Sequence, residues 1–304
     1  MKLGFMTACL PRLDLVQIAK WAAANDFEAL EIAALPRTGD HAATNHLDVT
    51  DVTQDQAENI FAVLERFNLE LSSLGYYENN LHPDPTIRET THQHLDTVID
   101  TAAALGCSIV GTFVGRDPTK TVNQNLHEAE QVFKPLVEHA GERGVKLMVE
   151  NCPMEGWHAE GRPGNLAYSP ELWEWMFSLG LYLNFDPSHL VWLGIDPVMA
   201  VRDYSYRVIH AQAKDTELLP TARNRYGIFG KAMRTDPWDS GWWRHRMPGL
   251  GEVDWRRLID AMYETDFTGV LSVEHEDPVW DGDEAKIKAG LKIAHQTLRP
   301  LIVA

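Results

Sequence analysis

Apolar, β-branched runs alternate with segments of helical periodicity along the whole chain. Eight runs read as buried strands: Leu3–Ala8, Ala29–Ala34, Glu70–Tyr76, Ser108–Val114, Lys146–Glu150, Leu181–Asp186, Arg207–Ala213 and Gly269–Glu274. The helical segments that follow them are Leu15–Asn25, Gln54–Phe67, Ile87–Leu105, Leu126–Arg143, Pro170–Leu179, Pro197–Tyr206, Trp255–Thr265 and Ala285–Leu298. Because the runs are too continuously apolar for a half-exposed sheet, the pattern predicts parallel strands covered by helices.

Eight strand–helix units predict an α/β protein folded as a single (β/α)₈ barrel over residues 1–304. The alternative is an open, doubly wound sheet, which usually carries a glycine-rich phosphate loop after its first strand. Here the first strand runs into Thr7-Ala8-Cys9-Leu10-Pro11, which has no such loop. We find no linker or shift in composition that would divide the chain, so the closed barrel is the preferred prediction.

Two predicted loops between a strand and the next helix are long, at residues 151–169 and 215–254. Connections of this length in a compact domain are usually lids or binding loops. Both belong to the face on which barrel active sites lie. The second loop is rich in Trp and Arg, which also make subunit contacts, so an interface in a homodimer or homotetramer is the alternative expectation.

Charge and cysteine content limit the partners of the protein. The chain has 27 basic and 44 acidic residues, a formal net charge of −17, and such a field repels nucleic acids and anionic membranes. No signal-peptide pattern begins the chain and no apolar run nears the roughly 20 residues that span a bilayer. We therefore expect a cytoplasmic protein that binds neither nucleic acids nor membranes.

The three cysteines, Cys9, Cys107 and Cys152, are expected to be buried thiols, with Cys152 beside a predicted pocket.

Carboxylates end three of the predicted strands. Glu150, Asp186 and Glu274 each follow an apolar run, and strand ends on one side of a barrel converge. Each residue by itself fits a solvated rim position or a helix cap. Together they indicate a site for a hard divalent cation, because buried carboxylates are costly unless they are paired or bound to metal.

The seventh strand adds His210, Gln212 and Lys214, which point to the same side at spacings of about 6.6 Å. Gln212 lies nearer the mouth and can ligate a metal through its amide oxygen. His210 is expected one layer deeper, as a core histidine or a substrate contact. Lys214 either binds substrate or forms a structural ion pair with Asp215. His189, three residues after Asp186, lies just past a strand end, from where it can reach the same pocket and bond substrate or transfer a proton; the alternative is a surface-loop histidine.

Five segments together resemble the sugar phosphate isomerase/epimerase family of xylose-isomerase-like barrels, a group that includes the endonuclease IV fold. They are Val149–Asn151, Asn184–His189, His210–Asp215, Pro248–Trp255 and Ser272–Asp277. The resemblance implies one divalent ion, with Mn²⁺ expected ahead of Mg²⁺, Co²⁺ or Zn²⁺. The implied ligands are Glu150, Asp186, Gln212 and Glu274. Position 212 departs from the family, which has a histidine there.

The same resemblance implies roles around the metal. Glu150 and Glu274 act as the acid/base pair next to a substrate carbonyl, and His189 contacts the substrate. Arg246 resembles a substrate-clamping arginine. We also assign substrate binding to His210, Lys214 and Trp157, the last in the first long loop.

Four functions are compatible with these residues. The first is a metal-dependent sugar isomerase or epimerase acting on a small carbohydrate. The second is a lyase or dehydratase on a 3-keto-glycoside, which begins with the same proton abstraction and is favoured by the Trp-rich loop. An abasic-site endonuclease is disfavoured by the acidic charge and the few strand-end histidines. A non-catalytic barrel subunit is supported by Gln212. The absence of a clear Lys/Arg cluster favours a non-phosphorylated substrate.

Overall fold

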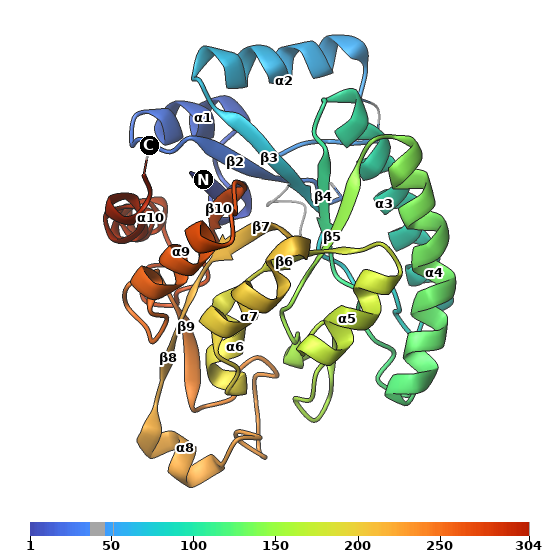
Figure 1. The fold of residues 1–304 in the computed structure, drawn as a ribbon, viewed down its shortest axis with the longest axis vertical. Coiled ribbons are helices and arrows are strands. Elements are labelled where there is room, and N and C mark those ends of the chain that lie inside the picture. The colour runs from blue at the N-terminus through green and yellow to red at the C-terminus, as the bar shows by residue number, and fades with distance from the viewer. Residues whose placement is uncertain (37–45, 51, 304) are drawn as a thin grey trace.

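Eight parallel strands close into a barrel in the order β1-β10-β7-β6-β5-β4-β3-β2 (Figure 1). The computed structural model describes residues 1–36, 46–50 and 52–303. The barrel strands are β1 (Lys2–Met6), β2 (Ala29–Ala33), β3 (Glu70–Gly75), β4 (Ile109–Thr112), β5 (Lys146–Glu150), β6 (Tyr182–Phe185), β7 (Val208–Ala213) and β10 (Val270–Val273). Seven of them lie inside runs predicted from the sequence, and β1 begins one residue before its predicted run; the (β/α)₈ prediction is confirmed.

Helices surround the strands on the outside of the barrel (Figure 1). They are α1 (Leu15–Ala23), α2 (Gln54–Arg66), α3 (Pro85–Ala104), α4 (Val122–Glu142), α5 (Pro170–Ser178), α6 (Pro187–Leu193), α7 (Pro197–Tyr204), α9 (Trp255–Glu264) and α10 (Glu284–Leu298). Helix α4 begins four residues earlier than predicted, because the Thr121 side chain accepts from the Gln124 backbone and Gln124 bonds back in a capping box. Helix α6 was not predicted.

Glycines end several helices as expected. Gly106, Gly144 and Gly180 follow α3, α4 and α5 with φ of 61°, 71° and 94°. Glycine adopts this left-handed conformation without the steric cost of a Cβ atom. The chain therefore turns sharply from each helix into the next strand.

The hydrophobic core lies between the barrel and its helices. Phe133 on α4 and Trp173 on α5 are completely buried, as are barrel residues such as Leu147 and Leu183 at 2% and 0% exposure. Burial of each large apolar side chain contributes about 1.5–3 kcal/mol. This packing fixes the strand ends that carry the polar residues described below. None of the helices in the described part of the chain has the length and apolarity needed to cross a membrane.

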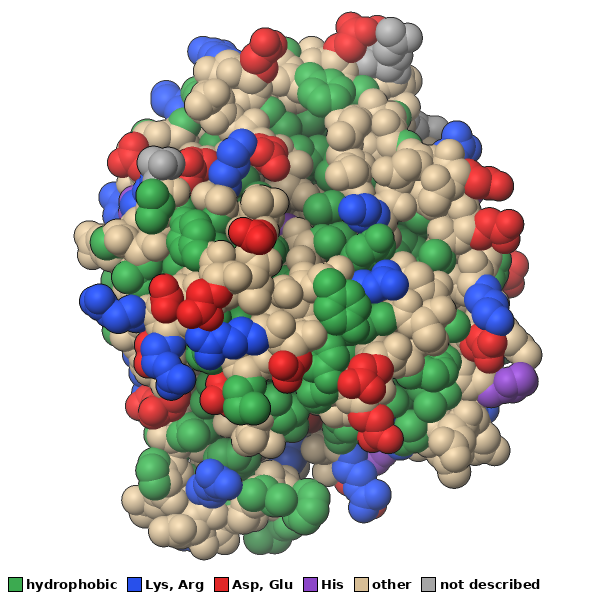
Figure 2. All heavy atoms as spheres, viewed as in Figure 1, with side chains coloured by type: hydrophobic (Ala, Val, Ile, Leu, Met, Phe, Trp, Pro, Cys, Tyr) green, Lys and Arg blue, Asp and Glu red, His purple; other side chains and the backbone are tan. Residues whose placement is uncertain are grey.

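The second long loop contains regular structure that the sequence pattern did not indicate. Strand β8 (Asp215–Leu218) pairs antiparallel with β9 (Trp243–Arg246), and α8 (Pro220–Tyr226) lies between them. This insertion extends away from the barrel at the lower edge of Figure 1, and apolar side chains cover part of its surface in Figure 2. Phe229 and Met233 are 80% and 94% exposed there. A subunit contact at this insertion stays a prediction.

Asp215 ties the insertion to the barrel. Its Oδ1 accepts from the backbone N–H groups of Thr216 at 2.8 Å and Val253 at 2.9 Å, and its Oδ2 accepts from Gly249 N and Trp255 Nε1, both at 3.0 Å. Asp215 is fully buried. Three of these four donors belong to α9 or the segment before it, and the fourth is the neighbouring Thr216, so Asp215 is a structural residue and does not pair with Lys214.

We expect Asp215→Ala to lower the free energy of unfolding by about 3 kcal/mol or more, because several buried N–H groups lose their acceptor. Urea denaturation of the full chain measures this. The matched control is Asp203→Ala on the exposed side of α7, expected to change stability by less than about 0.5 kcal/mol. Equal stability of the two variants would show that Asp215 does not anchor the insertion.

Candidate active site

Three carboxylates meet at the C-terminal mouth of the barrel. Glu150 is the last residue of β5, Asp186 directly follows β6, and Glu274 directly follows β10. One carboxylate oxygen of each lies within 4.8 Å of one oxygen of the other two. Strands β5, β6, β7 and β10 are consecutive neighbours in the barrel, which is why their ends converge. The structure therefore brings together the three carboxylates singled out from the sequence.

Lys214 occupies the centre of this acidic group. Its Nζ lies 2.6 Å from Glu274 Oε2, 2.8 Å from Glu276 Oε2 and 3.1 Å from Asp186 Oδ2, but 4.0 Å from Glu150 Oε1. The side chain is 2% exposed. The predicted ion pair with Asp215 is wrong, because adjacent residues on an extended strand point to opposite sides. Lys214 instead neutralises the carboxylates around it.

The carboxyl groups differ in how readily they ionise. Burial raises the pKa of Glu150, and burial also raises the pKa of Glu274 well above its ordinary range despite the nearby ammonium. Burial opposes ionisation of Asp186 as well, but the positive charges of Lys214 and His189 outweigh it and lower its pKa. The environment therefore pushes the pKa values of Glu150 and Glu274 upward and that of Asp186 downward, and carboxyl groups separated in this way suit acid/base chemistry.

His189 lies inside the cluster. Its Nε2 is 3.3 Å from Asp186 Oδ2 and 3.5 Å from Glu150 Oε1, and its side chain is 1% exposed. The alternative of a surface-loop histidine is wrong, because Pro187 starts helix α6 immediately after β6 with Asp186 as its N-cap, and His189 is buried. The first turn of α6 directs His189 back toward the strand ends.

Cys152 completes the group on the β5 side. Its Sγ lies within 4.8 Å of a ring nitrogen of His189 and an oxygen of Glu150. Burial raises the pKa of the Cys152 thiol to about 12, so it is protonated at neutral pH. The expectation that Cys152 lines a pocket is confirmed.

Gln212 contacts Glu150. With its amide nitrogen on the Glu150 side, it donates to both carboxylate oxygens at 3.2 Å. This orientation positions Glu150 and turns the amide oxygen away from it. A ligand role for Gln212 requires the opposite orientation and stays a prediction.

His210 lies below this layer, away from the cavity. Its Nδ1 and Nε2 bond Asn184 Oδ1 at 2.9 Å and Ser72 Oγ at 3.2 Å, and its side chain is completely buried. Burial lowers the pKa of its imidazole. Of the two expectations for His210, this environment favours the core histidine over the substrate contact.

Two other predicted substrate contacts lie at the edge of the site. Arg246 on β9 donates through Nη1 to Glu217 at 2.5 Å and through Nε to Asp277 at 2.9 Å, so two acids hold its guanidinium. Trp157 packs edge-on against Phe113, which lines the cavity, with ring centroids 5.4 Å apart. Neither residue joins the carboxylate cluster, and their binding of substrate stays a prediction.

The structure adds two residues that were not assigned to the site. Glu276 contacts Lys214, and Tyr77 donates to Glu31 at 2.6 Å while accepting from Asn184 at 2.8 Å. Glu276 lies two residues after Glu274, beyond the end of β10, and therefore points to the same side. This shared parity was the only feature of the sequence that indicated a place for Glu276 near the site. No signal indicated Tyr77, because its role depends on which strands become neighbours.

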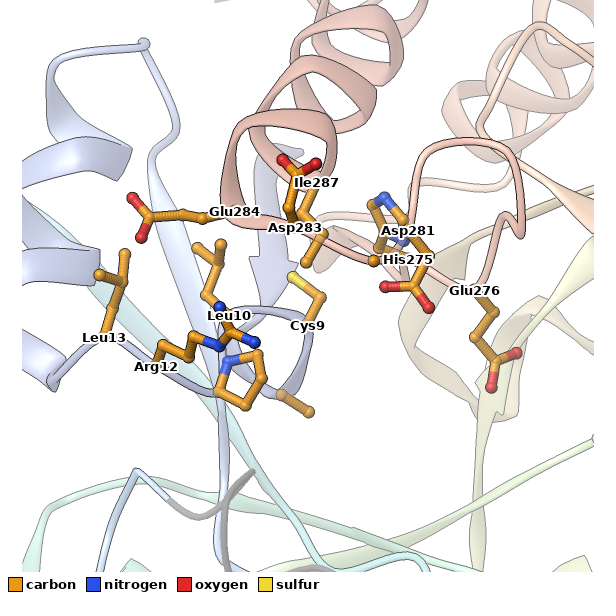
Figure 3. Close-up of a pocket in the computed structure, with 13 residues that line it drawn as sticks. Cys9, Leu10, Arg12, Leu13, His275, Glu276, Asp281, Asp283, Glu284 and Ile287 are labelled. Atoms are coloured by element: carbon orange, nitrogen blue, oxygen red, sulfur yellow. The ribbon is translucent and has the colours of Figure 1, made fainter.

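A cavity of about 290 Å³ opens over the cluster and is lined by Glu150, Cys152, Lys214, Glu274 and Glu276 together with apolar side chains including Phe113 and Met154. A second cavity of about 480 Å³ adjoins it through Cys9, His275 and Glu276. Figure 3 shows this second cavity between the segment after β1, which carries Arg12, and the start of α10. The acids Asp281 and Asp283 also line it. Both volumes suit a small organic molecule.

Residues 19–297 match the family described as the xylose isomerase-like TIM barrel. The chain belongs to this family. Over 98% of its length it is 25% identical to "Uncharacterized protein YfiH" of Bacillus subtilis, covering 99% of that protein. A stretch of 101 residues, 32% of each chain, is 31% identical to an inosose dehydratase of Clostridium botulinum.

Solved structures of the same fold include an IolI protein with a bound zinc atom, at a TM-score of 0.71 and 18% identity, with full coverage of both chains. Another is a D-tagatose 3-epimerase-like protein, at a TM-score of 0.69 and 18% identity, over 99% of this chain and 98% of that one. At these identities the likeness shows the fold. The site itself must carry any statement about the reaction.

Proposed function

We propose that this protein is a divalent-metal-dependent isomerase or epimerase that exchanges a proton next to the carbonyl of a small, non-phosphorylated carbohydrate. One observation carries the proposal: Glu150 and Glu274 face the same cavity from different strands, within 4.8 Å of each other, and both have raised pKa values. Family membership and the epimerase-like structural relative support the same class of chemistry.

The chain's own residues can perform the proton exchange. A carboxylate on one side of the substrate takes the proton from carbon, and a protonated carboxyl on the other side returns one. Glu150 and Glu274 hold these roles. Gln212 orients Glu150 by donating to it, and Lys214 directly orients Glu274. The ammonium of Lys214, which also lines the cavity, places positive charge beside the negative charge that develops on the substrate oxygen.

The donor atoms at the site fit a divalent cation. His189 Nδ1 is buried without a hydrogen-bond partner, and Asp186 Oδ2 is held only by the positive group of Lys214 and the ring of His189, which marks these atoms as candidate ligand atoms. Glu150, Asp186 and Glu274 would hold the ion, as the sequence predicts, and Gln212 could join them by turning its amide oxygen inward. A bound ion would act as a Lewis acid toward the substrate oxygens. The expectation of Mn²⁺ rests on this oxygen-rich set.

A dehydratase or lyase acting on a keto sugar or 3-keto-glycoside is the second candidate. It is favoured by the 101-residue match to inosose dehydratase. The same proton abstraction would be followed by loss of the group on the neighbouring carbon. Glu274, whose pKa burial raises well above its ordinary range, is the acid that would protonate the leaving group. Glu276 at the rim is not, because the charges of Lys214 and His245 outweigh burial and lower its pKa to about 2.

Exchange in D₂O tests the proposal. The metal-loaded protein is incubated with a panel of ketoses and 3-keto-glycosides, and the products are followed by NMR. We expect deuterium on the carbon next to the carbonyl, in an epimer or isomer of the substrate. Deuterium accompanied by an elimination product would select the second candidate. No deuterium in any compound, with metal bound, would contradict both and favour a non-catalytic barrel.

A further inference from the structure

Two groups of possible metal ligands share Glu150. The oxygen group consists of Glu150, Asp186 and Glu274, and the mixed group consists of Glu150, Cys152 and His189. The atoms of each group lie within 4.8 Å of one another. A metal ion cannot use both groups fully, so the surroundings of each decide where it binds.

The oxygen group already has a cation. Lys214 Nζ lies 2.6 Å from Glu274 and 3.1 Å from Asp186, and it also donates to Glu276 at 2.8 Å. A divalent ion on the same oxygens would be in direct repulsion with this buried ammonium, which has no room to be solvated at 2% exposure. Binding there would require Lys214 to leave two of its three short contacts.

Of the mixed group, only Glu150 is a carboxylate that Lys214 approaches, and its distance of 4.0 Å is the longest of the four. His189 is 1% exposed; its Nε2 approaches carboxylate oxygens at 3.3 and 3.5 Å, and its Nδ1 has no hydrogen-bond partner. Cys152 is 9% exposed and free of any disulfide. A buried imidazole nitrogen without a partner has capacity that a ligand would satisfy.

The local chain geometry explains how the three donors meet. Glu150 and Cys152 are two residues apart at the end of β5, a spacing that directs extended side chains to the same side. His189 comes from the first turn of α6, after the neighbouring strand. Sulfur, imidazole nitrogen and carboxylate oxygen are the donors of zinc sites, and catalytic zinc sites have three protein ligands with one position left open. Glu150 and Cys152 both line the cavity in which the substrate is proposed to bind.

We propose that the metal of this protein is a thiophilic ion of the zinc class, held by Glu150, Cys152 and His189 while Lys214 neutralises the remaining carboxylates. The Cys152 thiol gives its proton to water when its sulfur binds the ion. This inference rests on the proposed metal dependence and replaces the oxygen-rich ligand set with a mixed one. It makes Mn²⁺ and Mg²⁺ poor occupants, because hard ions disfavour thiolate.

Titration of the metal-free full-length protein with Co²⁺ tests the proposal without relying on activity. A thiolate ligand produces an intense sulfur-to-cobalt charge-transfer band in the near ultraviolet. We expect the band to saturate at one equivalent, to disappear on addition of Zn²⁺, and to persist in excess Mn²⁺. It should be absent from Cys152→Ser and retained in the matched control Cys107→Ser, whose thiol lies outside the site. Circular dichroism confirms that each variant is folded.

The other outcomes separate this proposal from the proposed function. Co²⁺ bound tightly without a charge-transfer band would place the ion on the oxygen group, and a band that survives in Cys152→Ser would identify another cysteine as the ligand; either result overturns this inference alone. No binding of Co²⁺ or Zn²⁺ would overturn it together with the metal dependence. Proton exchange in D₂O, measured separately, decides whether the catalytic proposal stands. A further variant, His189→Asn, is expected to weaken Co²⁺ binding at least tenfold, and unchanged affinity would contradict its role as a ligand.

Discussion

Glu150→Gln is expected to lower the rate of epimerisation by about 10²–10⁴-fold, the usual contribution of a positioned acid/base group. The substitution keeps the size of the side chain but removes the ability to take a proton. Deuterium incorporation in D₂O, followed by NMR, measures the effect. Glu130→Gln on the exposed surface of α4, where the carboxylate only pairs with Lys134, is the matched control and should leave the rate unchanged.

Comparison with Glu274→Gln sharpens this test. If the two carboxyls work from opposite faces, each single variant loses epimerisation but keeps exchange for the epimer whose proton faces the remaining carboxyl. If one variant loses all proton exchange and the other keeps the full rate of exchange, a single carboxyl acts as the base. Retention of full epimerisation in Glu150→Gln would show that Glu150 is not part of the proton-transfer pair.

Lys214→Met is expected to lower the free energy of unfolding by about 3–5 kcal/mol in metal-free buffer, because removal of one partner leaves buried charges uncompensated. Its short contacts to Asp186, Glu274 and Glu276 are the basis of this expectation. Urea denaturation in the presence of a chelator measures it. Mn²⁺ should then stabilise Lys214→Met more than the unmodified protein, because the oxygen group becomes open to a hard ion.

The control for this variant is Lys134→Met, which removes an exposed pair with Glu130 at 2.6 Å. Exposed pairs contribute about 0–1 kcal/mol, so little change is expected. If Lys214→Met is as stable as Lys134→Met without metal, the acidic cluster does not depend on Lys214 for neutralisation. If Mn²⁺ stabilises both proteins equally, Lys214 does not compete with the ion.

The sequence was sufficient for the fold because its signals are local. Strand runs and helical periodicity repeat eight times, and glycines such as Gly106 and Gly144 mark the turns between them. The convergence of Glu150, Asp186 and Glu274 also followed, since each residue sits at a strand end and parallel strands in a barrel end on one face. These conclusions required only the position of a residue within its own element.

Tertiary structure decided how the site residues pair. Parity placed Lys214 on the inner side of β7, but the acids around it come from the ends of β6 and β10, the two strands that pair with β7. His189 reaches the cluster only because α6 begins directly after β6, and Asp215 turns instead to the segment before α9. The chain pattern thus determined which carboxylates gather at the mouth. Which cation neutralises them depends on distances between elements far apart in sequence, which no local pattern encodes.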